Sequence, residues 1–198
     1  EYGGGRMADT IVSWLEKKTG PPATTLATVE EATAFTTGKD VSVIGFFADE
    51  TTDAAKAFLA AASNMDDFQF AITSSPEVAA EHKVEGEAVL LLKTFDDGRA
   101  VLSEDTTEEA VVLFVSSESL PLVVEFNQDT AQKIFSGEIK SHLLAFLSGK
   151  AESHTDDVAM IADIAKDHKG KMLFVTINTD EEDHKRILEF FGILETEL

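Results

Sequence analysis

The chain carries one pattern of short apolar segments separated by helical segments, and it carries that pattern twice. Residues 43–47 resemble residues 143–147, and residues 68–72 resemble residues 172–176. Apolar runs of this length that alternate with helices are typical of a sheet buried between helical layers. The sequence therefore predicts two tandem copies of one α/β fold, each with a central mixed sheet flanked by helices.

The first copy is expected to follow the order βαβαβαββα. Two signals predict how it closes: Asp97-Gly98 predicts a tight hairpin, and Thr106-x-x-Glu109 predicts a capping box before the last helix. The expected strands are residues 24–26, 41–47, 68–73, 88–95 and 99–102, and the expected helices are residues 30–35, 52–64, 76–83 and 110–115.

The second copy is expected to begin after Pro121 and to end before its hairpin, so that it is truncated. A Thr179-x-x-Glu182 capping box predicts the start of its last helix. The expected strands are residues 122–126, 142–147 and 171–178, and the expected helices are residues 129–135, 156–167 and 179–191. A closing hairpin would pair with residues 142–147. We therefore expect an unpaired strand edge, and a second copy that is loosely folded or aggregation-prone when it is expressed alone.

A separate short helix is expected near the beginning of the sequence. Met7, Ile11 and Trp14 share one helical face, and residues 19–22 read Thr-Gly-Pro-Pro, which ends a helix. Residues 1–5 offer this apolar face nothing to pack on, so the helix is interpreted as the end of a preceding domain. The expected domains are residues 1–20, 21–118 and 119–198, the last one incomplete.

The charge of the chain excludes several classes of partner. Sixteen Lys and Arg stand against thirty-seven Asp and Glu, for a net charge of −21, which repels nucleic-acid phosphates and anionic lipids. No apolar run approaches the roughly 18–20 residues of a membrane-spanning helix. We therefore expect neither a nucleic-acid nor a membrane partner. A highly soluble surface and diffuse, weak Ca²⁺ binding both remain open as explanations of the acidity.

The sequence lacks the residue patterns that predict a cofactor or metal site. The chain has no Cys, which excludes thiol chemistry, disulfides and thiolate metal sites. The five His form no i, i+4 pair, and no twelve-residue calcium loop or strand-linked Gly-rich phosphate loop is present. Carboxylate clusters such as residues 180–183 are interpreted as helix-terminal charges rather than acid/base pairs. No cofactor and no metal site are expected.

Several segments resemble the protein disulfide isomerase family. They include VIGFF at residues 43–47, KTFDDGR at 93–99, LPLVVEF at 120–126, IFSGEIK at 134–140 and RILEFFG at 186–192. The resemblance covers nearly the whole chain, and the βαβαβαββα order is that of the thioredoxin fold. It implies an internal segment of such an isomerase in the lumen of the endoplasmic reticulum, with two non-catalytic thioredoxin-like domains.

The departures from the family pattern concern the redox site. Catalytic domains of the family carry Cys-Gly-His-Cys after the central strand, where residues 51–54 here read Thr-Thr-Asp-Ala, and Glu87 stands where they carry a cis-proline. The resemblance therefore implies a chain without thiol–disulfide exchange of its own. It implies instead that the chain binds unfolded client proteins and peptides while neighbouring catalytic domains exchange their disulfides.

The family's principal client-peptide site lies in the second non-catalytic domain. Carried over by position, the resemblance implies a lining of Ala145, Leu147, Ile161 and Val175. Leu147 and Val175 are expected near strand ends with Ile161 on the helix between them, so that one surface could hold all three. The alternative interpretation is that these apolar residues are ordinary core.

A second functional class stays open on the sequence alone. Tandem thioredoxin domains with a strongly acidic surface are also similar to calsequestrin, a Ca²⁺-storage protein. The segments at residues 120–126 and 186–192 favour the isomerase. An independent redox enzyme is excluded because the chain has no cysteine.

Overall fold

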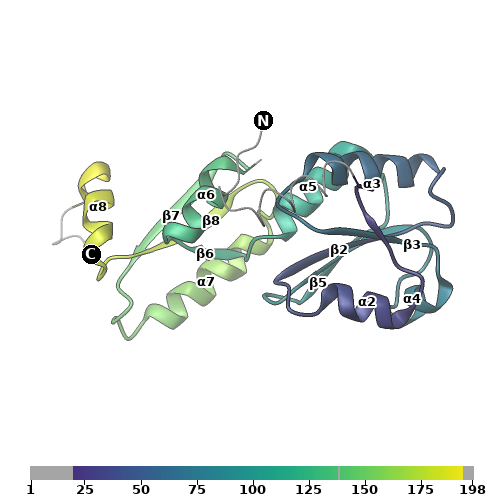
Figure 1. The fold of residues 1–198 in the computed structure, drawn as a ribbon. Helices are drawn as coiled ribbons and strands as arrows, with labels where there is room; N and C mark the ends of the chain where they lie inside the picture. The colour runs from purple at the N-terminus through teal and green to yellow at the C-terminus, as the bar shows by residue number, and fades with distance from the viewer. Residues whose placement is uncertain (1–19, 138, 194–198) are drawn as a thin grey trace, which may run out of the picture. The chain divides into compact units, whose positions relative to one another are not determined.

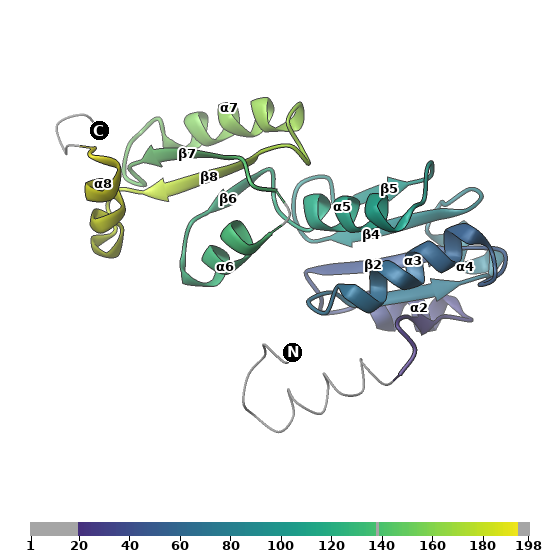
Figure 2. The same cartoon turned by 90° about the horizontal axis from the view of Figure 1, so that it is seen from above.

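The computed structural model describes residues 20–137 and 139–193, so the helix expected within residues 7–18 lies outside the described residues. The described chain forms two compact units, which meet in the sequence between Val115 and Ser116. Both units carry the α/β architecture that the sequence predicts (Figures 1 and 2).

Unit 1 is a five-stranded mixed sheet with the strand order β1-β3-β2-β4-β5. The central strands β2 and β3 are parallel, and β4 and β5 follow as an antiparallel hairpin beside β2. The strands are β1 (Thr24–Thr25), β2 (Val41–Phe46), β3 (Phe70–Thr73), β4 (Ala88–Lys93) and β5 (Arg99–Leu102).

Helices cover both faces of this sheet because its strands are apolar on both sides. Helices α2 (Val29–Thr36) and α4 (Pro76–Glu81) pack on one face, and α3 (Asp53–Asn64) and α5 (Glu108–Glu118) pack on the other (Figure 1). Alternate residues of β2 enter the two cores, with Val43 on the α3 side and Ile44 on the α2 side. Unit 1 is therefore a three-layer sandwich.

Two local expectations for unit 1 are wrong in detail. The last helix is capped by Thr107 rather than Thr106, because the Ala110 N–H donates to Thr107 Oγ1 at 3.2 Å; the residue three positions after Thr107 is Ala110, so no Glu completes a capping box. The hairpin is wider than a two-residue turn. Residues 94–98 connect β4 to β5, and the positive φ angles fall on Asp96 and Gly98.

Unit 2 repeats the first half of the same fold. Its sheet has the order β6-β8-β7 with every pair parallel, which corresponds to β1-β3-β2 of unit 1. The elements are β6 (Val123–Glu125), α6 (Gln128–Ser136), β7 (His142–Leu147), α7 (His154–Lys166), β8 (Leu173–Asn178), a 3-10 turn (Glu182–His184) and α8 (Lys185–Phe191). Strands equivalent to β4 and β5 are not among the described residues of unit 2.

The end of β8 differs from its expected form. Thr179 does not cap a helix; its N–H donates to the Leu147 carbonyl at 3.0 Å, and the chain makes a 3-10 turn before α8 begins at Lys185. Gly192 ends α8 in the left-handed conformation with φ +69°. Helix α8 is therefore shorter than the helix that the sequence predicts over residues 179–191.

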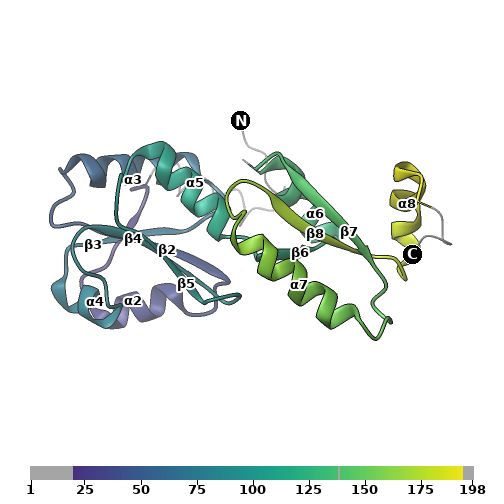
Figure 3. The ribbon, with the colours of Figure 1, turned by 180° about the vertical axis from the view of Figure 1, so that it is seen from behind.

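The two faces of the unit 2 sheet are covered by different helices. Alternate side chains Val124, Val175 and Leu144 pack with Ile134 of α6 on one face. The other face carries α7, which lies on the opposite side of the sheet from α6 (Figure 3). Among residues 20–137 and 139–193, no helix combines the length and hydrophobicity that crossing a membrane requires.

Strand β7 pairs only with β8 in the described part of the chain, whereas β2 pairs on both sides. Five of the six residues of β2 are buried and none of β7 is; Leu143 is 39% exposed. We expect backbone amides of β7 to exchange hydrogen faster than those of β2, because an edge strand opens more readily. Hydrogen exchange with mass spectrometry measures this, and equal protection of the two strands would contradict it.

Candidate functional site

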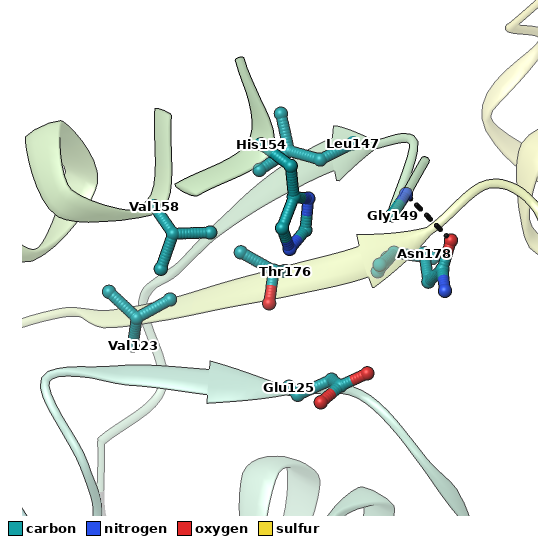
Figure 4. A pocket seen from close by; sticks show the side chains of 9 residues that line it. Val123, Glu125, Leu147, Gly149, His154, Val158, Thr176 and Asn178 are labelled. Carbon is teal, nitrogen blue, oxygen red and sulfur yellow. Dashed lines mark hydrogen bonds between the residues drawn. The ribbon is translucent and has the colours of Figure 1, made fainter. Parts of the chain in front are cut away.

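Unit 2 contains a cavity of about 240 Å³ beneath the first turns of α7, toward the carboxyl ends of β7 and β8 (Figure 4). Its walls are partly apolar and partly polar. The lining residues are Val123, Glu125, Leu147, Gly149, His154, Val158, Thr176, Ile177 and Asn178.

Strand register brings the side chains of Val123, Glu125, Leu147, Thr176 and Asn178 to one face of the sheet. Glu125 is in register with Thr176, and Leu147 with Asn178. Because side chains alternate along a strand, these positions point to the side opposite Val124 and Val175, which is the side that α7 covers. On α7, His154 and Val158 stand one turn apart and face the sheet (Figure 4). Three strands and one helix therefore build the cavity.

A hydrogen-bonded network holds the loop that enters α7. Asn178 Oδ1 accepts from the N–H groups of Gly149 (3.2 Å) and Asp180 (3.0 Å). Asp180 Oδ2 accepts from the Ser148 hydroxyl at 2.9 Å and the Lys150 N–H at 3.1 Å. Donation by Ser148 and then by Lys150, together with the Lys150 charge, lowers the pKa of Asp180 below its usual range. This network fixes one end of the cavity wall.

Two polar side chains of the lining lack partners in the part of the chain that the structure describes. The Nδ1 atom of His154 is shielded from solvent and has no hydrogen-bond partner, although buried polar atoms normally have one. The Glu125 side chain is exposed; its backbone carbonyl accepts from the Thr130 hydroxyl at 2.7 Å, and its carboxylate has no hydrogen bond or ion pair with a described residue. The imidazole of His154 points from α7 into the space between Leu147 and Thr176 (Figure 4).

The residues predicted for the site fall on both faces of the sheet. Leu147 lines the cavity. Ala145 shares its face, in register with Thr176, and Ile161 lies one turn beyond Val158 on the sheet-facing side of α7. Val175 is fully buried against α6 on the opposite face. Leu147, Ile161 and Val175 therefore do not share the single surface expected for them, because the side chain of Val175 points to the opposite face of the sheet.

Sequence reasoning missed most of the cavity lining. Glu125, Thr176 and Asn178 are polar and carry no apolar signal, and the helix expected at residues 156–167 begins after His154. Two signals could have found them: the strand positions share parity with Leu147 once the parallel register is known, and His154, Val158 and Ile161 follow helical spacing. The register itself could not be obtained from local sequence.

The corresponding corner of unit 1 is occupied by structural hydrogen bonds. Thr52 caps α3, with its Oγ1 accepting from the Ala55 N–H at 3.2 Å. The Glu87 carboxylate accepts from the Ala48 N–H at 3.4 Å across the end of the sheet. Thr52 and Glu87, at the positions where the resemblance implied a dithiol and a cis-proline in catalytic domains, thus make structural hydrogen bonds in this domain.

No group of three or more His, Asp or Glu side chains is arranged to hold a metal ion within residues 20–137 and 139–193. The polar side chains of the cavity come from two strands, β6 and β8, and from α7, and they can form hydrogen bonds. The described residues of unit 2 therefore form a small cavity with apolar walls and a carboxylate at its rim.

Comparison with known proteins gives the family. A profile described as a thioredoxin-like domain matches residues 47–198. The chain belongs to the thioredoxin-like domain family. It is 46% identical over 197 residues to the protein disulfide-isomerase of Oryctolagus cuniculus. The aligned region covers 100% of this chain and 39% of that relative.

Solved structures agree on the fold of this thioredoxin-like chain. The zinc-bound form of human ERp44 superposes with a TM-score of 0.65 at 17% identity, covering 100% of this chain and 57% of that one. The bb fragment of ERp72 superposes with a TM-score of 0.56 at 19% identity, covering 89% of this chain and 81% of that fragment. The thioredoxin fold predicted from the element order is confirmed.

Proposed function

We propose that this chain is the segment of a protein disulfide isomerase that binds unfolded client protein in the lumen of the endoplasmic reticulum. The cavity beneath α7 carries this proposal, because Val123, Leu147 and Val158 give it apolar walls that an exposed client side chain can enter. The 46% identity to a protein disulfide-isomerase supports the assignment, and the chain spans 39% of that relative's length.

Binding at such a site is weak, which suits the proposed task. A client that buries a few hundred Å² of apolar surface gains roughly 5–10 kcal/mol at about 25 cal/mol/Å², and association and ordering costs remove much of this. Weak binding lets a client leave and return while catalytic domains elsewhere in a longer protein exchange its disulfides. Tethering the domains in one chain keeps the client at a high effective concentration.

Leu147→Asp tests the proposal. Leu147 is partly buried and lines the cavity, so a carboxylate at this position reaches solvent and the fold is retained. We expect the affinity for an unstructured fluorescent peptide to fall about tenfold, since the substitution removes the burial of one Leu side chain. Fluorescence anisotropy measures the affinity, and far-UV circular dichroism checks the fold.

Leu143→Asp is the matched control. Leu143 lies four residues before Leu147 on the same strand and on the same face of the sheet. It is exposed and does not line the cavity. Its substitution should leave peptide affinity unchanged. Equal affinity of folded Leu147→Asp and the unchanged chain would remove the cavity from the proposed function. Millimolar, many-site Ca²⁺ uptake with polymerisation, without peptide binding, would favour the Ca²⁺-storage alternative.

A further inference from the structure

The cavity carries polar chemistry that an apolar client side chain would not use. The Glu125 carboxylate stands at its rim without a partner among the described residues. The basic side chain nearest in sequence to the cavity wall, Lys150, is already paired with Asp180, with 3.6 Å between Nζ and Oδ1. No described side chain therefore neutralises the negative charge of Glu125, which is exposed to solvent.

The size of the cavity limits what it can hold. Its volume of about 240 Å³ is below the roughly 300–1,000 Å³ of pockets for drug-sized ligands. One large amino-acid side chain is the scale of ligand that fits. The walls made by Val123, Leu147 and Val158 suit a methylene stem, and Glu125 at the rim suits a positive end.

His154 adds a second group that favours a hydrogen-bond donor. Its shielded Nδ1 has no partner, so the imidazole gains a hydrogen bond if the ring turns toward a donor in the cavity. Guanidinium and ammonium groups carry several N–H donors and no acceptor. A basic side chain can therefore satisfy both the carboxylate and the imidazole, whereas an acidic side chain is repelled by Glu125.

We propose that the cavity selects a basic side chain, Arg or Lys, of an unfolded client. The methylene stem lies against Val123 and Leu147, and the charged end lies at Glu125. This inference rests on the proposed client-binding function and names the class of side chain that the same site takes.

A set of peptides identical except for one central residue tests the selection. The central residue is Arg, Lys, the uncharged norleucine, or Glu, and affinities are measured by fluorescence anisotropy at physiological salt. We expect the Arg and Lys peptides to bind about fivefold more tightly than the norleucine peptide. Glu125→Gln should abolish this difference and leave the affinity for norleucine unchanged, because the apolar walls remain.

The net charge of −21 attracts any cationic peptide, so a matched control is needed. Glu189→Gln makes the same change of charge at an exposed position of α8, whose Ile187 packs on the opposite face of the sheet. It should keep the preference for Arg and Lys. A preference that survives Glu125→Gln, or that Glu189→Gln reduces equally, overturns the inference.

Failure of this inference can be distinguished from failure of the proposed function. If the norleucine peptide binds and Arg and Lys give no advantage, the cavity binds clients without selecting basic side chains. If none of the four peptides binds, the client-binding function itself is overturned.

Discussion

Val175→Asp should unfold unit 2. Val175 is 0% exposed and lies between Val124 and Leu144 in the sheet, beneath Ile134 of α6. A carboxylate buried there has no partner, and an uncompensated buried charge costs about 3–5 kcal/mol. Urea unfolding followed by far-UV circular dichroism measures the loss, and hydrogen exchange by segment assigns it to residues 116–193 rather than to unit 1.

Two further variants show that this loss comes from the buried charge. Leu143→Asp introduces the same carboxylate at a position that is 39% exposed and should cost less than about 1 kcal/mol. Val175→Ala removes volume without adding charge and should cost an intermediate amount. A Val175→Asp variant that stays folded but loses peptide binding would contradict the assignment of Val175 to the α6 face and would return it to the binding site.

Gly45→Ala should destabilise unit 1 by roughly 3 kcal/mol, at the upper end of the usual cost of overpacking a core. A Cβ at Gly45 would lie 2.6 Å from Cε2 of Phe47 and 2.8 Å from Cε1 of Phe58. Both rings are buried, and they pack against each other with 5.5 Å between their centroids. Thermal unfolding, with hydrogen exchange assigned to residues 20–115, measures the effect.

Gly38→Ala and a double variant isolate the steric cause. Gly38 has φ +74° and no atom within 4 Å of an added Cβ, so its substitution tests backbone strain alone and should cost about 1 kcal/mol. Combining Gly45→Ala with Phe58→Leu replaces the aromatic ring that the new methyl group meets by a smaller aliphatic side chain. If the double variant is no more stable than the sum of its single changes predicts, the clash with Phe58 is not the cause.

The two copies of the fold show how far strand burial depends on neighbours. Strands β2 and β7 have similar apolar sequences, yet β2 is buried and β7 is half-exposed. The difference arises because β4 pairs with β2 and α3 and α5 cover one of its faces, whereas β7 has β8 alone as a strand partner in the described part of the chain. The exposed rings of Phe190 (83%) and Phe191 (51%) belong to the same less-covered unit.

The repeated α/β pattern and most strands and helices could be predicted from the amino-acid sequence, because these follow from periodicity, caps and β-branched runs within short windows. The sequence also excluded thiol chemistry, since the chain has no cysteine. Element ends were less predictable: the cap at Thr107 rather than Thr106, and the 3-10 turn after β8, depend on which backbone groups find partners in the folded chain.

Which residues lie together around the cavity became clear from strand pairing and not from local sequence. Leu147 and Val175 look alike in the sequence, but the register β6-β8-β7 turns them to opposite faces, and a shift of one residue would reverse this. The same register brings Glu125, His154 and Asn178 around one cavity. Strand pairing is set by contacts distant in sequence, so local patterns could name the apolar residues of unit 2 but could not assign them to the core or to the cavity.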